Sequence, residues 1–164
     1  EEIEVALDQL AGDITERLST NMPVVYSIMN GGLIFAGKLL PRLDFPLEVG
    51  YMHATRYRGD TTGQTELQWQ ALPSCPMDGR SVLILDDIFD EGNTLAEVVE
   101  ACKAQGAKEV VTAVLVNKVH DRKNTDLQVD FCGLDVEDRF VFGFGMDYRG
   151  YWRNARGIYA VKGL

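Results

Sequence analysis

The residues best suited to chemistry lie in one short stretch, VLILDDIFDEGNTL, which spans Val82–Leu95. Four aliphatic residues lead directly into Asp86 and Asp87, and two more acids follow at Asp90 and Glu91. Glycine and Asn-Thr then open a predicted helix. The first turn of a helix attracts anions, because its unpaired N–H groups and the positive end of its dipole converge there. The motif therefore crowds four acids beside a place suited to an anion.

Different residues of the motif can bind different groups of one ligand, which accounts for this combination. Asp86 and Asp87 close a strand, where the alternation of side chains points them to different sides. The loop from Asp90 to Thr94 can form a nest of backbone N–H groups with a hydroxyl at Thr94, which would hold a phosphate. A ligand with a phosphate at one end, vicinal hydroxyls in the middle and a metal-bound anion beyond them would use all these groups. Ribose 5-phosphate activated at C1′ fits that description.

The elements that position this motif alternate along the chain. Apolar residues at helical spacing predict an amphipathic helix over 3–18, a second helix after Gly32 that stops at Pro41, and a third behind the motif that ends at Gly106. Apolar runs predict buried strands at residues 23–29, 47–54, 81–85 and 109–117, and shorter β segments at 129–136 and 139–145. Residues 67–72, LQWQAL, alternate as a hairpin strand would. This order indicates an α/β fold, a doubly wound, mainly parallel sheet flanked by helices, in a single domain of residues 1–164.

Two segments should meet at one edge of that sheet. Ligands of open α/β sheets bind beyond the carboxyl ends of the strands. The glycine turn Met29–Gly32 and the acidic segment Asp86–Thr94 both follow such ends, so we expect them to face one crevice. Between the second strand and the motif, Thr55–Glu66 is polar, contains glycine and lacks periodicity, which indicates an exposed, mobile loop.

Composition limits the partners. With 25 acids against 16 bases the formal charge is −9, which argues against a surface for nucleic acid or anionic membrane. Cys75, Cys102 and Cys132 are widely spaced and flanked by apolar residues, so neither a disulfide framework nor a zinc site is expected. No apolar run reaches the roughly 18 residues of a membrane span and no signal peptide opens the chain. We expect a soluble, cytoplasmic protein.

The motif resembles the phosphoribosyl-pyrophosphate binding motif of type I phosphoribosyltransferases, an aliphatic run, two acids, two apolar residues and then Asp-x-Gly-x-Thr. Three more segments resemble the hypoxanthine-guanine phosphoribosyltransferase branch: MNGG after the first strand, LVNK at the strand following the motif, and RFVFGFGMDYRGYWR near the end. The resemblance covers nearly the whole chain. It implies the type I phosphoribosyltransferase fold, with a small hood from the chain ends.

The activity that this resemblance implies is purine salvage. Such an enzyme is a Mg²⁺-dependent glycosyltransferase that moves the 5-phosphoribosyl group from phosphoribosyl pyrophosphate to N9 of hypoxanthine or guanine, giving IMP or GMP and pyrophosphate. The implied partners are these two substrates and further copies of the chain, as a homodimer or homotetramer. Thr55–Glu66 would be the lid that excludes water, and residues 130–164 the purine-binding hood.

The resemblance also implies roles for the motif. The acids that match Asp86 and Asp87 contact the ribose hydroxyls, with Mg²⁺ nearby, and the aspartate that matches Asp90 lies near purine N7 as general base or acid. The 5′-phosphate would lie in the loop formed by Asp90, Glu91, Gly92, Asn93 and Thr94. Glu91 departs from the Ser or Thr of many relatives, and a carboxylate there repels phosphate unless it points away.

The remaining implied roles belong to residues outside the motif. Lys118 matches the catalytic lysine that donates to purine O6, while Phe140 matches the aromatic ring stacked on the base and Val141 the residue whose backbone reads the base edge. Asp147, also in the purine site, matches an acid that helps to hold Mg²⁺ and pyrophosphate. The backbone at Asn30 and Gly31, preceded by a peptide bond that is often cis in relatives, and the side chain of Arg153 would bind pyrophosphate. Arg153 could equally pair with a carboxylate such as that of Asp147.

Two other classes of protein would also use parts of this pattern. A regulator could keep the fold and the ligand site but bind nucleic acid, which the acidic balance disfavours. A phosphoacceptor signalling domain could use the aspartate pair, but the Asp-x-Gly-x-Thr loop would then have no purpose. His53 and His120 are isolated in the sequence, and an isolated histidine is poor evidence for a metal or acid-base site.

Overall fold

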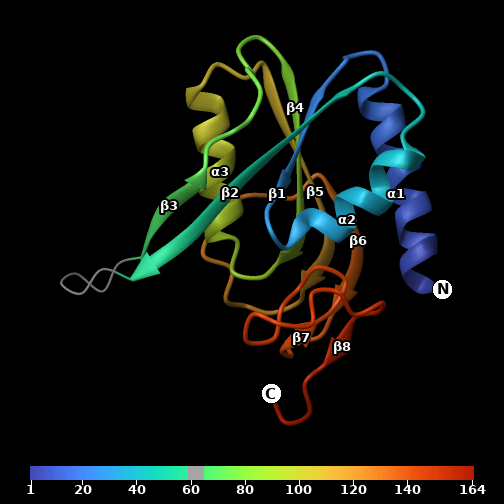
Figure 1. Ribbon diagram of the computed structural model, residues 1–164, viewed down its shortest axis with the longest axis vertical. Helices are drawn as coiled ribbons and strands as arrows, with labels where there is room; N and C mark the ends of the chain where they lie inside the picture. The colour runs from blue at the N-terminus through green and yellow to red at the C-terminus, as the bar shows by residue number, and fades with distance from the viewer. Residues whose placement is uncertain (59–64) are drawn as a thin grey trace.

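The computed structural model describes residues 1–58 and 65–164. In these residues a six-stranded sheet has helices on both faces, and a two-stranded sheet lies near the C-terminus (Figure 1). The elements, in chain order, are α1 (Glu2–Leu18), β1 (Val24–Ile28), α2 (Gly32–Leu39), the short 3-10 helix η1 (Leu40–Arg42), β2 (Glu48–Arg58), β3 (Thr65–Ala71), β4 (Ser81–Phe89), α3 (Asn93–Ala104), β5 (Glu109–Lys118), β6 (Phe131–Val136), β7 (Val141–Phe142) and β8 (Tyr159–Ala160).

The large sheet has the strand order β3-β2-β1-β4-β5-β6. All neighbouring strands run parallel except β2 and β3, which form an antiparallel pair. The chain leaves β1 towards one edge and returns to β4 on its other side, so the direction of winding reverses between β1 and β4. Ligands of doubly wound sheets bind at such a switch point. The predicted fold class is confirmed.

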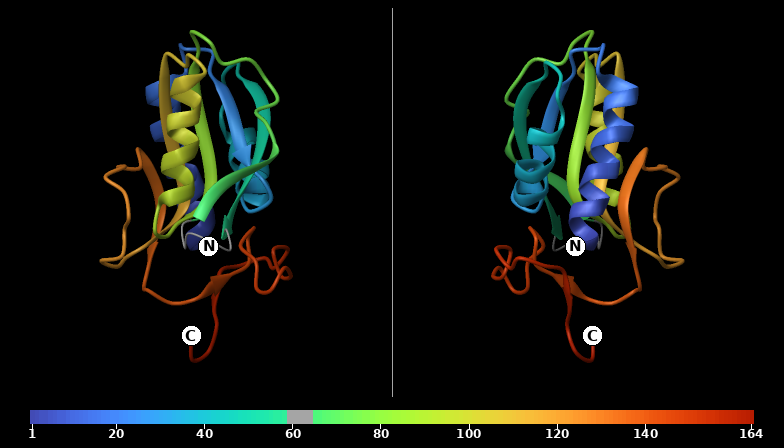
Figure 2. Two further views of the ribbon diagram at one scale, coloured as in Figure 1. Left: turned by 90° about the vertical axis from the view of Figure 1, so that its left-hand side faces the viewer. Right: turned by 90° about the vertical axis from the view of Figure 1, so that its right-hand side faces the viewer.

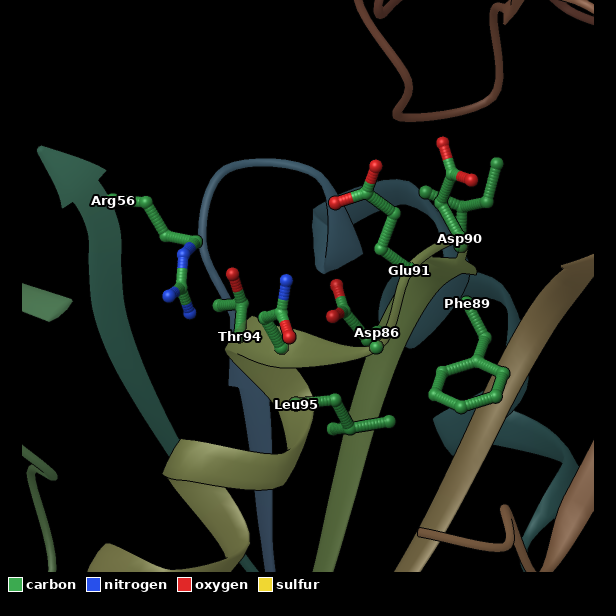
Figure 3. Close-up of a pocket in the computed structure, with 10 residues that line it drawn as sticks. Arg56, Asp86, Phe89, Asp90, Glu91, Thr94 and Leu95 are labelled. Carbon is green, nitrogen blue, oxygen red and sulfur yellow. The ribbon is translucent and has the colours of Figure 1, made fainter. Parts of the chain in front are cut away.

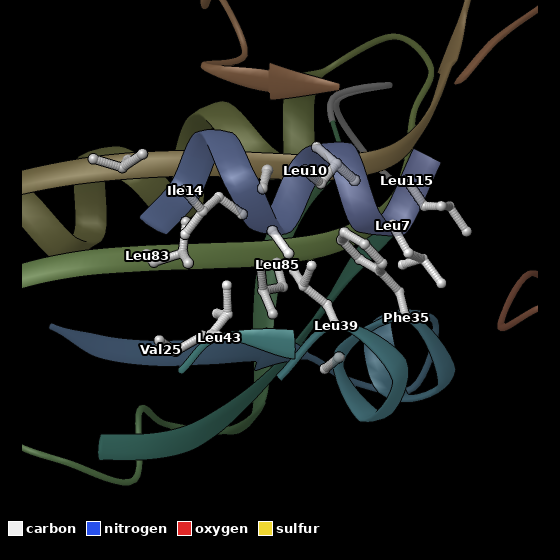
Figure 4. Close-up of a cluster of buried hydrophobic side chains, with 14 of the residues drawn as sticks. Leu7, Leu10, Ile14, Val25, Phe35, Leu39, Leu43, Leu83, Leu85 and Leu115 are labelled. Atoms are coloured by element: carbon white, nitrogen blue, oxygen red, sulfur yellow. The ribbon is translucent and has the colours of Figure 1, made fainter. Parts of the chain in front are cut away.

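Alternation along β4 divides the apolar core between the two faces. Leu83 and Leu85 pack with α1 and α2, whereas Val82 and Ile84 pack on the other face with α3. Figure 4 shows the first of these clusters, where the leucines of α1 lie over β4 and α2. Because side chains alternate with a period of two, the next residues of β4 are also directed to opposite faces.

Helix α1 has the amphipathic pattern that its sequence predicts. Its apolar side chains at helical spacing are buried, and they meet Phe35 and Leu39 of α2. Leu7, Ile14 and Leu18 have no exposed surface. Truncation of such a leucine to alanine costs about 2–5 kcal/mol of folding free energy, so this helix is a main anchor of the sheet. No helix in the described part of the chain is long and apolar enough to cross a membrane.

The prediction of a mobile loop over Thr55–Glu66 is wrong at both ends of that segment. Thr55–Arg58 continue β2, and β3 begins at Thr65, with Arg56 opposite Leu67 in the antiparallel ladder. The strands predicted at 47–54 and 67–72 are confirmed as parts of β2 and β3. A ladder of backbone hydrogen bonds does not require apolar side chains, and for this reason the polar pattern concealed only the ends of the two strands. Residues 59–64 of the expected lid lie outside the described residues.

The expected hood also needs a correction. Residues 131–136 form β6, which pairs in parallel with β5 and belongs to the large sheet, so the second sheet starts only at Val141. Helix α1 packs against β6 and β5 and takes no part in the second sheet. Figure 2 shows β7 and β8 beyond one end of the six-stranded sheet. The C-terminal end of the chain alone builds this second sheet.

Candidate active site

The loop between β4 and α3 forms one wall of a cavity of about 330 Å³ (Figure 3). Asn93 and Thr94 open α3, so the first turn of that helix faces the cavity. Unpaired N–H groups at a helix start favour an anion there. The residues that line the cavity are Arg56, Asp86, Ile88, Phe89, Asp90, Glu91, Gly92, Asn93, Thr94 and Leu95.

Gly92 gives this loop its shape. It caps α3 in the left-handed region with φ of +88°, which L side chains rarely adopt. A Cβ atom at this position would lie 2.6 Å from Cγ2 of Thr125 and 2.7 Å from the ring of Phe89. Both the backbone conformation and the close packing therefore require glycine.

Asp86 and Asp87 face different cavities, as the alternation predicts. Asp86 lines the cavity beside α3, whereas Asp87 lines a second cavity of about 150 Å³. Burial and the neighbouring charge of Asp87 raise the pKa of Asp86 well above its usual range. Burial likewise raises the pKa of Asp87, against which the positive charge of Arg153 acts. The second cavity is lined by Asp87, Ile88, Asp90, Lys118, Phe140, Val141, Met146 and Asp147.

Asp90 lies between the two cavities and lines both. Lys118, from the end of β5, donates from Nζ to Oδ2 of Asp90 over 2.9 Å, and Nε2 of His120 lies 2.6 Å from Oδ1. Burial alone would raise the pKa of Asp90, but the hydrogen bonds with Lys118 and His120 outweigh it and lower the pKa. Asp90 is therefore ionised at neutral pH and can accept a proton.

The glycine turn after β1 meets the acidic motif as expected. The Met29–Asn30 peptide bond is cis. Asn30 is exposed, and Gly31 lies so close to the motif that a Cβ atom there would be 2.2 Å from Oδ2 of Asp87. The carbonyl oxygen of Gly31 would in turn be 2.0 Å from a Cβ atom at Gly145. Small residues thus bring three backbone segments together around Asp87.

Arg153 and Asp147 lie on the segment that carries Gly145. Arg153 donates from Nη1 to the carbonyl oxygen of Gly145 over 2.7 Å, and its Nη2 lies 3.6 Å from Oδ1 of Asp147. Oδ2 of Asp147 accepts from the backbone N–H of Gly150. The structure thus pairs Arg153 with Asp147, the second of the two alternatives that the sequence left open, beside Asp87.

Phe140 and Val141 form the outer wall of the second cavity. Val141 pairs with Ala160 in the small sheet, and the ring of Phe140 packs edge-to-face on Tyr148 with 5.8 Å between centroids. Phe140 remains 42% exposed, which is high for a large apolar side chain. An aromatic face is therefore available beside Lys118 and Asp90.

Residues 1–149 match the family model described as a phosphoribosyl transferase domain. This chain belongs to the phosphoribosyltransferase family. It is 32% identical over 162 residues to the hypoxanthine-guanine phosphoribosyltransferase of Bacillus subtilis, a match that covers 99% of this chain and 89% of that protein. It is 29% identical over 163 residues to the hypoxanthine-guanine-xanthine phosphoribosyltransferase of Tritrichomonas foetus, with 99% and 88% covered. The structure is similar to the crystal structure of a hypoxanthine phosphoribosyltransferase from Staphylococcus aureus, with a TM-score of 0.92, 27% identity and coverage of 99% and 88%.

The sequence reasoning missed three residues of this phosphoribosyltransferase's site. Arg56 of β2 faces the β4–α3 loop across the first cavity and pairs with Glu97 of α3 (Figure 3). His120 contacts Asp90, and Lys123 lies under the loop. One signal was available for His120, since it follows Lys118 by two residues and an extended chain directs such a pair to the same side.

Lys123 forms hydrogen bonds at the ends of both β4 and β5. Its Nζ lies 2.8 Å from the carbonyl oxygen of Phe89, 2.6 Å from that of Asp90 and 2.9 Å from that of Lys118. The ammonium group also lies 4.2 Å from the centre of the Phe89 ring. Burial lowers the pKa of Lys123, and the charge of Asp90 acts in the opposite direction. This one side chain connects the end of β4 to the end of β5 beside the β4–α3 loop.

Glu91, the departure from the family pattern, has a cationic neighbour. Its Oε1 lies 3.7 Å from Nη1 of Arg122, and Arg122 also pairs with Asp138. The Glu91 side chain is about half exposed and lines the first cavity. Arg122 therefore offsets part of the negative charge that Glu91 adds beside the anion site.

The acids expected to bind metal do not form a complete cage. Among residues 1–58 and 65–164, no three His, Cys, Asp or Glu side chains come together as a metal site. Mg²⁺, however, is usually held by one or two carboxylates together with water and substrate phosphates. Burial raises the pKa values of the neighbouring carboxyls of Asp86 and Asp87, and the charge of Asp87 raises that of Asp86 further, so a cation beside them would relieve an unfavourable charge. The donor set fits Mg²⁺.

Proposed function

We propose that this phosphoribosyltransferase moves the 5-phosphoribosyl group from phosphoribosyl pyrophosphate to N9 of hypoxanthine or guanine, with IMP or GMP and pyrophosphate as products. The observation that carries the proposal is the position of Asp90 between two cavities, one at the start of a helix and one beside an exposed aromatic ring. A ribose that bridges them would present C1′ to a purine at Asp90.

The first cavity suits the sugar and its phosphate. The 5′-phosphate would bind the loop of Asp90, Glu91, Gly92, Asn93 and Thr94, and the ribose hydroxyls would face Asp86 and Asp87. In the reaction the bond between C1′ and pyrophosphate breaks as the bond to N9 forms, through a state with oxocarbenium character. Fixed negative charge beside the sugar stabilises such a cation.

The second cavity suits a 6-oxopurine. The base would stack on Phe140, with Val141 at its edge, and Lys118 would donate to O6. The carboxylate of Asp90, freed from Lys118, would take the ring proton, and a positioned base of this kind contributes about 10²- to 10⁴-fold in rate. The ammonium of Lys118 cannot accept a hydrogen bond, so it suits the amino group of adenine poorly.

The leaving group requires positive charge and N–H donors. We assign pyrophosphate to the backbone of Asn30 and Gly31 and to Arg153, which would exchange its contact with Asp147 for the substrate. Asp147, at the rim of the purine cavity, would share Mg²⁺ with the substrate, and Asp86 and Asp87 would be the other carboxylates. When bound, Mg²⁺ neutralises charge on the departing pyrophosphate.

The remaining assignments concern the chain as a whole. We assign residues 1–164 to one domain and the purine-binding hood to its C-terminal part, from Phe140 onwards. The protein would work in the cytoplasm, as a homodimer or homotetramer, without a nucleic-acid or membrane partner. The acidic balance of the sequence supports the absence of those two partners.

Product identification tests this proposal. The protein is incubated with Mg²⁺, phosphoribosyl pyrophosphate and hypoxanthine, and the mixture is separated by chromatography. IMP and pyrophosphate in equal amounts are expected, and GMP when guanine replaces hypoxanthine. Free ribose 5-phosphate without nucleotide would show that water, and not a purine, is the acceptor, and would reject the assignment of the second cavity.

A further inference from the structure

His120 lies behind Asp90, away from both cavities. Its side chain is 4% exposed, and it lines neither the 330 Å³ nor the 150 Å³ cavity, whereas Asp90 lines both. The only contact between His120 and the site is the 2.6 Å approach of Nε2 to Oδ1 of Asp90, among the interactions that the structure describes. His120 can therefore act on a substrate only through Asp90.

The hydrogen bonds of the imidazole identify its tautomer. The backbone N–H of Arg122 donates to Nδ1 of His120 over 2.9 Å, so Nδ1 carries a lone pair. The proton of the neutral ring is then on Nε2, which donates to Asp90. Nearly complete burial and two fixed partners leave the ring little freedom to turn.

The second oxygen of Asp90 has a partner that must leave. Lys118 occupies Oδ2 in the free protein, and in the proposed reaction it turns to the purine. Without a second partner, the carboxylate of Asp90 would then be free to rotate. A general base must be held within hydrogen-bond reach of the proton that it takes. His120, on Oδ1, is the contact that can persist throughout the turnover.

We infer that His120 is a positioning residue for the reaction, which holds Oδ1 of Asp90 so that Oδ2 faces the purine when Lys118 leaves it. This inference rests on the proposed function. Oδ1 of Asp90 would then orient the carboxylate, and Oδ2 would accept the proton. The backbone N–H of Arg122 holds the imidazole ring of His120, and the ring in turn holds the carboxylate of Asp90.

The test compares two substitutions at this position. His120→Phe keeps a planar ring without the donor, and His120→Gln keeps an N–H donor without the ring. We expect His120→Phe to lower kcat by about 10- to 100-fold, the effect of losing a hydrogen bond to a charged group, with KM for phosphoribosyl pyrophosphate changed less than about 3-fold. His120→Gln should restore kcat to within about 3-fold of the unsubstituted protein.

The chain offers a control in its one other histidine, His53, which lies in β2, is partly buried and lines neither cavity. His53→Phe and His53→Gln should leave kcat unchanged. Thermal unfolding of all four variants separates loss of turnover from loss of fold. An unchanged kcat in His120→Phe, or an equal loss in His120→Phe and His120→Gln, would overturn the inference.

A second measurement does not depend on activity. Nitrogen-15 NMR of labelled histidine should find the His120 proton on Nε2, with a signal that moves when Asp90→Ala removes its acceptor. A proton on Nδ1 would overturn the inference. If the unsubstituted protein turns over no purine, the proposed function and the catalytic part of the inference fail together, and NMR still decides whether His120 holds Asp90.

Discussion

Lys118 on β5 and Asp90 at the end of β4 are joined by a hydrogen bond of 2.9 Å between Nζ and Oδ2. The two residues are 28 positions apart, and parallel pairing of β4 with β5 brings them to the same edge of the sheet. Both line the cavity assigned to the purine. The pair therefore couples the group that would bind the base to the group that would take its proton.

Lys118→Ala should affect the purine more than the sugar. We expect KM for hypoxanthine to rise by about 10- to 100-fold, because the donor to O6 is lost, and KM for phosphoribosyl pyrophosphate to change little. Steady-state kinetics with each substrate varied in turn measures both. Purine kinetics that match those of the unsubstituted protein would remove Lys118 from the site.

Lys118→Ala should also change how turnover depends on pH. Asp90 is active as a base only when ionised, so turnover falls as the pH drops through its pKa. Burial acts to raise this pKa, but Lys118 and His120 lower it below the ordinary value of an aspartate, so the loss of Lys118 acts to raise it. The acid limb of kcat/KM for hypoxanthine, which reports the protein before the purine binds, should therefore move to higher pH in Lys118→Ala. Lys123, the other cation near Asp90, remains in the variant.

Asp90→Asn should separate chemistry from binding. The amide keeps the shape of the side chain but cannot take the ring proton, so we expect kcat to fall by about 10²- to 10⁴-fold. Binding of phosphoribosyl pyrophosphate, measured by calorimetry, should change by less than about 3-fold, since the loop N–H groups are retained. A large loss of affinity with little loss of kcat would contradict the role of Asp90 as base.

Gly92→Val should damage binding of the sugar phosphate. The residue has φ of +88°, and a side chain would collide with Thr125 and Phe89, so the loop must change shape. Gly79→Val is the matched control, because Gly79 also has positive φ, at +69°, but has open space around its missing Cβ. We expect both variants to lose stability through the backbone, and only Gly92→Val to lose affinity for phosphoribosyl pyrophosphate. Equal affinities in the two variants would show that the loop does not hold the phosphate.

Lys123→Met should lower the stability of the protein. It leaves the carbonyl oxygens of Phe89, Asp90 and Lys118 without their shared donor, which we expect to cost about 1–3 kcal/mol of folding free energy. Lys103→Met is the control, since Lys103 is exposed and pairs only with Glu100 one helical turn away, among the described contacts. The control should change stability by less than about 0.5 kcal/mol in urea unfolding. Similar losses in the two variants would mean that Lys123 does not tie the strands together.

The sequence predicted the parts of this molecule that rest on local pattern. Apolar periodicity indicated the helices and the buried strands, and alternation at the end of β4 indicated that Asp86 and Asp87 lie on opposite sides. Each depends on residues close together in the chain. The mainly parallel, doubly wound sheet followed from the alternation of strand and helix.

The contacts that the sequence did not predict join segments far apart. His120 and Lys123 reach Asp90 and the carbonyl oxygen of Phe89 across about thirty positions. The spacing of His120 from Lys118 is a local signal, whereas the neighbourhood of Lys123 in the sequence does not mark it as a partner. Alternation predicted the strand at 67–72, but the extension of the hairpin through Thr55–Arg58 and Thr65–Glu66 was missed, because backbone pairing holds those polar residues. Side-chain chemistry that depends on tertiary contact is visible only once the fold is known.

The most direct test is an assay of pyrophosphate release from phosphoribosyl pyrophosphate with Mg²⁺, run in parallel with hypoxanthine, guanine, xanthine, adenine and no base. The account predicts release with hypoxanthine and guanine, none above background with adenine or without base, and loss of release when a chelator removes Mg²⁺. No turnover with any base, by folded protein that still binds phosphoribosyl pyrophosphate, would contradict it and indicate a protein that senses this ligand without using it.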